Sequence, residues 1–98
     1  MAIKLKVKFY VNLIEFIGKE EMQVDLADSE EHTIREVISK IDELEGKGFK
    51  KKALGTEARP IGSIRIVLNG KMVNGFHKYD TKVQNGDEIA FFPLIAGG

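Results

Sequence analysis

Two stretches near the start of the chain alternate between apolar and polar residues. The first covers residues 3–9, where Lys4, Lys6 and Lys8 hold the polar positions, and the second covers residues 21–26. Because successive side chains of a strand point to opposite faces of a sheet, this period of two predicts two half-buried strands. We expect the lysines to mark the exposed side of the first strand. The apolar positions are Ile3, Leu5, Val7, Phe9, Met22, Val24 and Leu26.

The clearest helix pattern begins at Thr33. Thr33 and Glu36 have the spacing of a capping box, in which each side chain binds the other residue's backbone N–H. The apolar residues that follow recur every three or four positions, which predicts one buried stripe on a helix that ends at Gly46. A shorter helical turn is expected over residues 10–17, before Gly18. The predicted stripe consists of Ile34, Val37, Ile38, Ile41 and Leu44.

The second half of the chain contains three further strand patterns. Residues 64–68 and 71–73 flank Asn69-Gly70, a dipeptide typical of a two-residue hairpin turn. A second turn signal over residues 85–87 precedes the last strand, which we expect over residues 88–95.

This order of elements predicts an α+β domain with one main helix on one face of a mixed sheet of about five strands. The apolar richness of the first and last strands favours central positions for both, which by analogy is the β-grasp arrangement of ubiquitin-like proteins. We expect the domain to span residues 1–95 and the tail, residues 96–98, to be flexible. The segment 47–63 shows no clear period, so we expect a surface loop with one helical turn at residues 49–54.

The composition excludes several classes of function. The chain has 98 residues, the size of one domain, and its 15 basic and 15 acidic side chains cancel, which argues against nucleic-acid partners. Without cysteine it has no disulfide, thiolate nucleophile or thiolate metal site. No apolar run approaches the roughly 18 residues that a membrane span needs, and the first residues do not resemble a secretory signal. We therefore expect a cytoplasmic protein without membrane contacts.

Few residues suggest catalysis. The two histidines, His32 and His77, are expected to be exposed to solvent. The acidic pairs Glu20-Glu21 and Glu30-Glu31 are sequence neighbours, whose side chains diverge on a strand. No phosphate-binding loop, metal-ligand spacing or Ser/His/Asp set stands out. We expect no metal site and no catalysis by the domain alone.

The last strand places one aromatic residue on each face. Phe91 and Phe92 are adjacent, so both cannot lie under the helix. If Ile89, Phe91 and Pro93 face the core, then Ala90, Phe92 and Leu94 face outward, and the opposite assignment would also leave one aromatic ring outside. We take Phe92 and Leu94 as the outward residues. Exposed apolar patches are typical of surfaces that bind a partner protein.

The chain ends in Ala96-Gly97-Gly98. Glycine has no Cβ, so this end presents a carboxylate that can enter a narrow slot. An extended tail from Pro93 reaches about 20 Å, far enough to enter a partner's active site. Two alternatives remain open: the segment 47–63 could fold over the apolar patch, or the diglycine could be a frayed end without a role.

These segments resemble the MoaD/ThiS-type ubiquitin-like sulfur carriers over nearly the whole chain. The most specific block, Phe91-Phe-Pro-Leu-Ile-Ala-Gly-Gly98, is most similar to the MoaD branch, the small subunit of molybdopterin synthase. Leu94 departs from the second proline common in the family, and the segment 47–63 is longer than in compact members. The weaker matching blocks are Val7-Lys-Phe-Tyr10, Leu13, Glu15, Gly18, Thr33-Ile-Arg-Glu-Val37, Val67-Leu-Asn-Gly70 and Asn85-Gly-Asp-Glu88.

The resemblance implies a carrier protein rather than an enzyme. A ubiquitin-activating-like adenylyltransferase would convert the Gly98 carboxylate to an acyl-adenylate, using ATP and Mg²⁺ that belong to that enzyme. This chain would hold no permanent cofactor. A sulfur donor protein would then leave a thiocarboxylate on Gly98, and the large subunit of molybdopterin synthase would receive the sulfur. Ala96 and Gly97 would pass through a slot, and the docking residues would be Phe92, Pro93 and Leu94.

Three other functions fit the same residues. The chain could be a protein modifier whose Gly98 becomes linked to lysines of other proteins. It could carry sulfur for thiazole synthesis, tRNA thiolation or another pathway. It could also be a ubiquitin-like binding domain whose diglycine has no role.

Overall fold

The structure is a computed structural model that describes residues 2–27, 31–46, 48–50, 64–73 and 78–93. Its regular elements follow the predicted order, with one additional 3₁₀ turn that the sequence pattern did not indicate. In chain order they are β1 (Ile3–Phe9), α1 (Asn12–Ile17), β2 (Glu21–Leu26), α2 (Ile34–Glu45), β3 (Ile64–Leu68), β4 (Lys71–Val73), the 3₁₀ turn η1 (Lys78–Asp80) and β5 (Glu88–Pro93).

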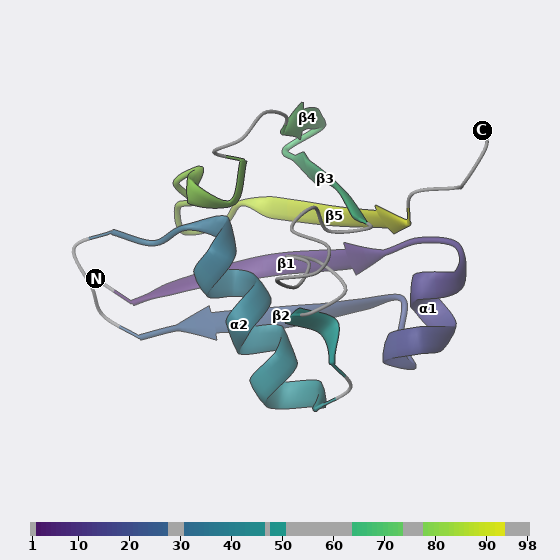
Figure 1. Ribbon diagram of the computed structural model, residues 1–98. Helices are drawn as coiled ribbons and strands as arrows, with labels where there is room; N and C mark the ends of the chain where they lie inside the picture. The colour runs from purple at the N-terminus through teal and green to yellow at the C-terminus, as the bar shows by residue number, and fades with distance from the viewer. Residues whose placement is uncertain (1, 28–30, 47, 51–63, 74–77, 94–98) are drawn as a thin grey trace, which may run out of the picture.

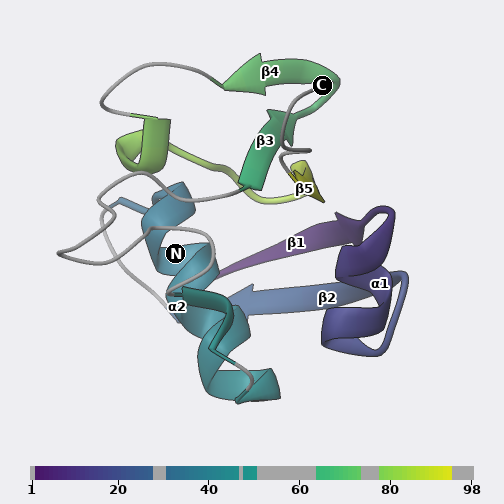
Figure 2. The ribbon, with the colours of Figure 1, turned by 45° about the vertical axis from the view of Figure 1, so that its right-hand side comes forward.

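The five strands form one mixed sheet in the order β2-β1-β5-β3-β4. The first and last strands, β1 and β5, occupy its centre, as the sequence predicted. They pair in parallel with each other, and the other strand pairs are antiparallel. α2 crosses one face of this sheet, while α1 lies at the end toward which β1 and β5 both run (Figure 1). The view turned by 45° places α1 and α2 at separate positions along β2 (Figure 2). This arrangement is the predicted β-grasp fold.

The hydrophobic core lies between α2 and the sheet. All the apolar positions of β1 and four of the five in the predicted helix stripe are buried. The fifth, Leu44, is 52% exposed, so its placement in the buried stripe was wrong. At 3.6 residues per turn Leu44 lies about 70° from the centre of the stripe, in the last turn of the helix. The buried residues of α1, α2 and β5 are Leu13, Ile17, Ile34, Val37, Ile38, Ile41, Ile89 and Phe91.

Phe49 belongs to the core, which corrects the predicted surface loop at this position. Its side chain is fully buried, and its ring meets those of Phe9 and Phe91 edge to face, with centroids 5.8 and 5.2 Å away. A single aromatic residue in a lysine-rich stretch without a period gave no signal of burial. The rest of the segment, residues 51–63, lies outside the described residues, as does most of the predicted turn at 49–54.

The start of α2 corrects two further predictions. The Thr33 hydroxyl accepts a hydrogen bond from the Glu36 N–H at 3.4 Å, which is the expected half of the capping box. The Glu36 carboxylate, however, lies 2.8 Å from Nδ1 of His32. His32 is buried rather than exposed to solvent. Its carbonyl accepts the Val83 N–H at 2.9 Å, which ties this part of the chain to the segment after η1. The other histidine, His77, lies outside the described residues.

The two predicted turns hold one end of the sheet together. Asn69-Gly70 has positive φ at both residues, as a two-residue hairpin turn of type I′ requires. The Asn69 side chain accepts the Glu88 N–H at 2.9 Å and donates to the Asp87 carboxylate at 3.0 Å. Asn85 accepts the Lys4 N–H at 2.8 Å. These residues join the hairpin, β1 and the start of β5, so we assign them a structural role.

Candidate docking face and tail exit

The face of the sheet opposite α2, called the open face below, is apolar on one half. The strand register places Lys8, Ala90 and Val67 in one row, and Met72 pairs with Val67 at the end of that row. Met72 is 50% exposed. The open face therefore carries an apolar strip over β5, β3 and β4, beside which the exposed Arg65 lies opposite Phe92.

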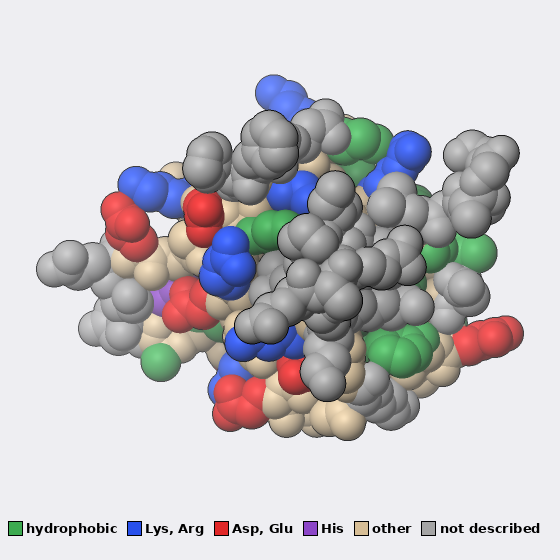
Figure 3. Space-filling model, in the orientation of Figure 1, with side chains coloured by type: hydrophobic (Ala, Val, Ile, Leu, Met, Phe, Trp, Pro, Cys, Tyr) green, Lys and Arg blue, Asp and Glu red, His purple; other side chains and the backbone are tan. Residues whose placement is uncertain are grey.

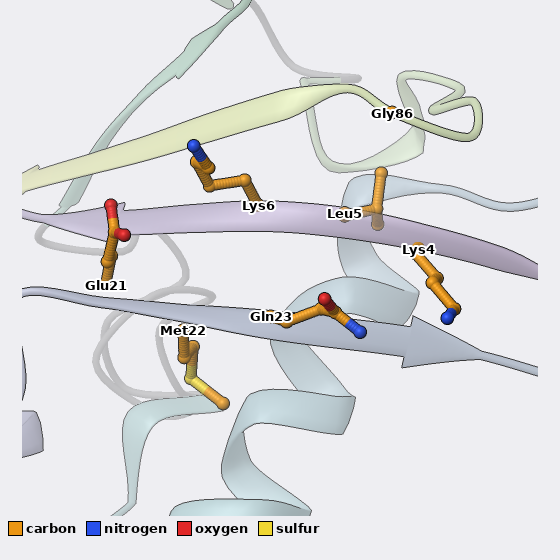
Figure 4. A pocket seen from close by; sticks show the side chains of 7 residues that line it. All are labelled: Lys4, Leu5, Lys6, Glu21, Met22, Gln23 and Gly86. Atoms are coloured by element: carbon orange, nitrogen blue, oxygen red, sulfur yellow. The ribbon is translucent and has the colours of Figure 1, made fainter.

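The other half of the open face, over β1 and β2, is polar. The lysines of β1 lie opposite polar residues of β2 in the register, and Lys4 and Lys6 are exposed as predicted. Figure 4 shows several of these side chains along β1 and β2, where they help to line a pocket of about 440 Å³. Its lining residues are Lys4, Leu5, Lys6, Glu21, Met22, Gln23 and Gly86. The contrast between the two halves marks the apolar one as the better protein-binding surface.

Phe92 lies on the open face, as predicted, and stacks on Tyr10. The ring centroids are 4.4 Å apart and the ring planes are inclined by 8°. The Tyr10 N–H donates to the Phe91 carbonyl at 3.1 Å, so the pairing of β1 with β5 continues one residue beyond β1. Tyr10 remains 37% exposed. Tyr10 was not among the predicted site residues, although it continues the alternation of residues 3–9 by one outward step.

Pro93 is the last described residue of β5. It lies opposite Ile64 of β3 and is half-buried, at the end of the sheet where Tyr10 and Phe92 stack. The strand predicted to reach Ile95 thus runs to Pro93 within the described part of the chain. The tail residues with predicted roles lie outside the described residues: Leu94, Ala96, Gly97 and Gly98.

One ion pair borders the apolar strip. The Lys8 ammonium donates to the Glu88 carboxylate at 3.2 Å across β1 and β5. The hydrogen bond and charge of Glu88 hold the pKa of Lys8 above its ordinary 10.5. Both groups are partly exposed to solvent, so the pair orients charge at the rim of the strip and adds little to stability.

The described residues contain no group of three His, Cys, Asp or Glu side chains placed to hold a metal ion. No helix in the described ranges is long and apolar enough to cross a membrane. On the face that carries α2, acidic and basic side chains lie among one another around the helix (Figure 3). Geometry therefore favours the open face as a docking surface for another protein.

Comparison with known proteins identifies the family. The ThiS family profile matches residues 7–98, which include the diglycine end. A putative sulfur carrier protein of Archaeoglobus fulgidus is 30% identical over 99 residues and covers all of both chains. The molybdopterin synthase sulfur carrier subunit of Haemophilus influenzae is 31% identical over 94 residues, which cover 96% of this chain and 99% of that subunit.

A solved structure supports the fold. The small archaeal modifier protein 1 of Methanosarcina acetivorans superposes with a TM-score of 0.74 and covers 100% of this chain and 99% of that one. Its sequence identity of 24% is evidence of shared fold alone. Together with the profile match over residues 7–98, the full-length relatives establish the family resemblance drawn from the motifs. The chain belongs to the ThiS family of MoaD/ThiS-type, ubiquitin-like sulfur carriers.

Proposed function

We propose that this chain carries sulfur as a thiocarboxylate on Gly98 and delivers it in molybdopterin synthesis. The observation that carries the proposal is the position of the exposed Tyr10–Phe92 stack, at the strand end from which the diglycine tail departs. The Haemophilus influenzae relative, named for molybdopterin synthase, supports this choice of pathway.

The chemistry begins with an unreactive group, because a carboxylate is anionic and offers a poor leaving group. In the first step a Gly98 carboxylate oxygen bonds to the α-phosphorus of ATP, and the bond from that phosphorus to the departing pyrophosphate breaks. In the second step hydrosulfide, supplied by a sulfur donor protein, adds to the acyl carbon. The bond to AMP then breaks and the hydrosulfide proton passes to solvent. The product is a thiocarboxylate, without any oxidation or reduction.

The activating enzyme would supply the catalytic groups for the first step. We assign this role to a ubiquitin-activating-like adenylyltransferase that binds ATP and Mg²⁺ itself. We propose the cytoplasm as the place of the reaction. The tail from Pro93 to Gly98 spans about 20 Å when extended. An enzyme that reaches Gly98 must therefore approach the stacked rings closely.

The roles of the tail residues follow from this geometry. Aromatic side chains at the centre of an interface often contribute most of its binding energy, so Phe92 is the main proposed anchor. Pro93 and Leu94 would extend the same contact along the departing chain. Ala96 and Gly97 would pass through the narrow slot that leads to the reaction centre, where a larger side chain would collide.

Intact-mass analysis of the protein isolated from its native cells tests the proposal. Replacement of one carboxylate oxygen by sulfur adds about 16 Da, and a chain that lacks Gly98 is the matched control. Incubation of the sulfur-loaded chain with the molybdopterin synthase large subunit and a pterin precursor then tests the acceptor. Loss of the added mass together with sulfur transfer to the precursor is the expected result.

Other outcomes would favour a different function for this chain. A stable sulfur-loaded chain that does not react with the large subunit would indicate another acceptor, such as the thiazole or tRNA pathway. Conjugates of high mass that disappear when Gly98 is deleted would indicate a protein modifier. If neither species forms when the cognate activating enzyme is supplied, the carrier function is wrong for this chain.

A further inference from the structure

Val11, in the turn between β1 and α1, has an unusual backbone conformation. Its φ is 58° and its ψ is −133°. A residue with a Cβ rarely adopts positive φ, and a β-branched residue is the least suited to it, because its side chain crowds the backbone. Glycine would form the same turn without this strain. The Val11 side chain therefore stands at a position where it adds backbone strain that glycine would avoid.

The interior of the protein gains little from the Val11 side chain. Val11 is 62% exposed, the highest value among the large apolar residues exposed in the described part of the chain. The backbone does contribute to the turn, because the Val11 carbonyl accepts the Ile14 N–H at 3.2 Å. A glycine would retain that hydrogen bond, so core packing does not explain the isopropyl group. Strained residues often cluster at sites of function.

The position of Val11 suggests a function in protein binding. Val11 directly follows Tyr10, whose ring stacks on Phe92 with 4.4 Å between the centroids. The turn lies at the end of the sheet toward which β1 and β5 both run (Figure 2). Five residues follow Pro93, so Gly98 lies within about 20 Å of this end even when the tail is fully extended. We call Tyr10, Val11 and Phe92 the exit rim.

We propose that Val11 is a specificity-determining contact of the exit rim, and that its isopropyl group enters an apolar pocket of the enzyme that activates Gly98. This inference rests on the proposed function. Activation of the carboxylate is common to sulfur transfer and to conjugation with lysine, since neither nucleophile reacts with a free carboxylate. Because the tail is short, the activating enzyme must cover the exit rim while it holds Gly98.

The test measures adenylation of the full-length chain by its cognate activating enzyme, as ATP–pyrophosphate exchange at varied carrier concentration. Val11→Gly should raise the KM for the carrier about tenfold and leave kcat unchanged, because the lost contact lies outside the reaction centre. Its thermal midpoint should stay the same or rise, since the strain at positive φ is relieved. Val11→Ile keeps a branched apolar side chain and should retain the wild-type KM.

Leu44→Ala is the matched control. Leu44 is also apolar and 52% exposed, but it lies in the last turn of α2, away from the exit rim. The KM of the activating enzyme for the Leu44→Ala carrier should stay within about twofold of the wild-type value, because peripheral exposed side chains contribute little to binding. A similar rise in KM for Leu44→Ala would show a general effect of surface hydrophobicity and would overturn the role of Val11.

The remaining outcomes separate the two proposals. If the enzyme activates the wild-type chain and Val11→Gly equally well, the inference about Val11 is wrong and the carrier function stands. If Val11→Gly lowers the thermal midpoint, the valine serves the fold and the inference is wrong as well. If the cognate enzyme does not activate the wild-type chain, both proposals fail together.

Discussion

The two faces of the sheet use the same strands for different purposes. On β5, Ile89 and Phe91 are fully buried on the face that carries the core, whereas Ala90 and Phe92 are half-buried on the open face. Both faces contain apolar side chains, so hydrophobicity alone does not distinguish them. The difference is that the core face has a helix over it, whereas the apolar strip of the open face is the proposed docking surface for another protein.

Phe91 and Phe92 show the difference between the two faces most directly. They are the same residue type at adjacent positions, and each ring stacks on an aromatic residue at the end of β1. Phe91 pairs with Phe9 inside the core, with 6.0 Å between the ring centroids, whereas Phe92 pairs with Tyr10 on the open face. We expect loss of the Phe91 ring to destabilise the fold, and loss of the Phe92 ring to weaken binding to a partner protein.

Phe91→Ala should have the largest effect. The substitution leaves a cavity among Phe9, Phe49 and the buried aliphatic side chains, and should lower the free energy of unfolding by about 3–5 kcal/mol. Denaturant titration monitored by circular dichroism measures this loss. A decrease below about 1 kcal/mol would contradict the placement of Phe91 in a tightly packed core.

Phe92→Ala is the matched substitution on the open face. It should weaken binding to the activating enzyme by about 1–3 kcal/mol, because the ring is a proposed anchor of the interface. Loss of the stack on Tyr10 should lower the free energy of unfolding by no more than about 1.5 kcal/mol. Titration calorimetry and denaturant unfolding measure the two quantities. Unchanged affinity or a collapsed domain would contradict the division between the faces.

Asn69→Ala tests a residue that serves the fold alone. It removes two side-chain hydrogen bonds, to Asp87 and to the backbone of Glu88, at the end of β5 away from the tail. We expect the free energy of unfolding to fall by about 1–2 kcal/mol, with no change in affinity for the activating enzyme. Asn69→Gly, which tolerates the positive φ of this position, should lose less. Weaker binding at normal stability would extend the docking surface beyond the exit rim.

Glu88→Gln should have the smallest effect. Glu88 holds the pKa of Lys8 above 10.5, so any stabilisation from this pair is present below pH 10.5 and is lost as the pH rises through the raised pKa. The substitution should return the pKa of Lys8 toward 10.5, which NMR titration of the lysine side chain measures. The free energy of unfolding at pH 7 should remain nearly unchanged, since the pair is exposed. A large loss at pH 7 would show that charge on the open face supports the fold.

Much of the candidate site could be predicted because strand geometry is local. Alternation along β5 was enough to place Phe92 on the face opposite to Phe91, and the same rule along β1 would have placed Tyr10 on the face of Phe92. The stacking of the two rings could not be predicted, since it depends on the parallel pairing of β1 with β5. The residue pattern did not indicate the unusual backbone of Val11, because its positive φ arises where the central strand β1 turns into α1.

The residue order was sufficient for the types of most elements, the caps and turns, the two faces of β5 and the family membership through Gly98. All of these depend on spacings of a few residues or on short motifs. The burial of Phe49 and His32 and the assembly of the exit rim emerged in the folded chain alone. Those features depend on contacts between segments that are distant along the chain, and local periodicity carries no information about which segments meet.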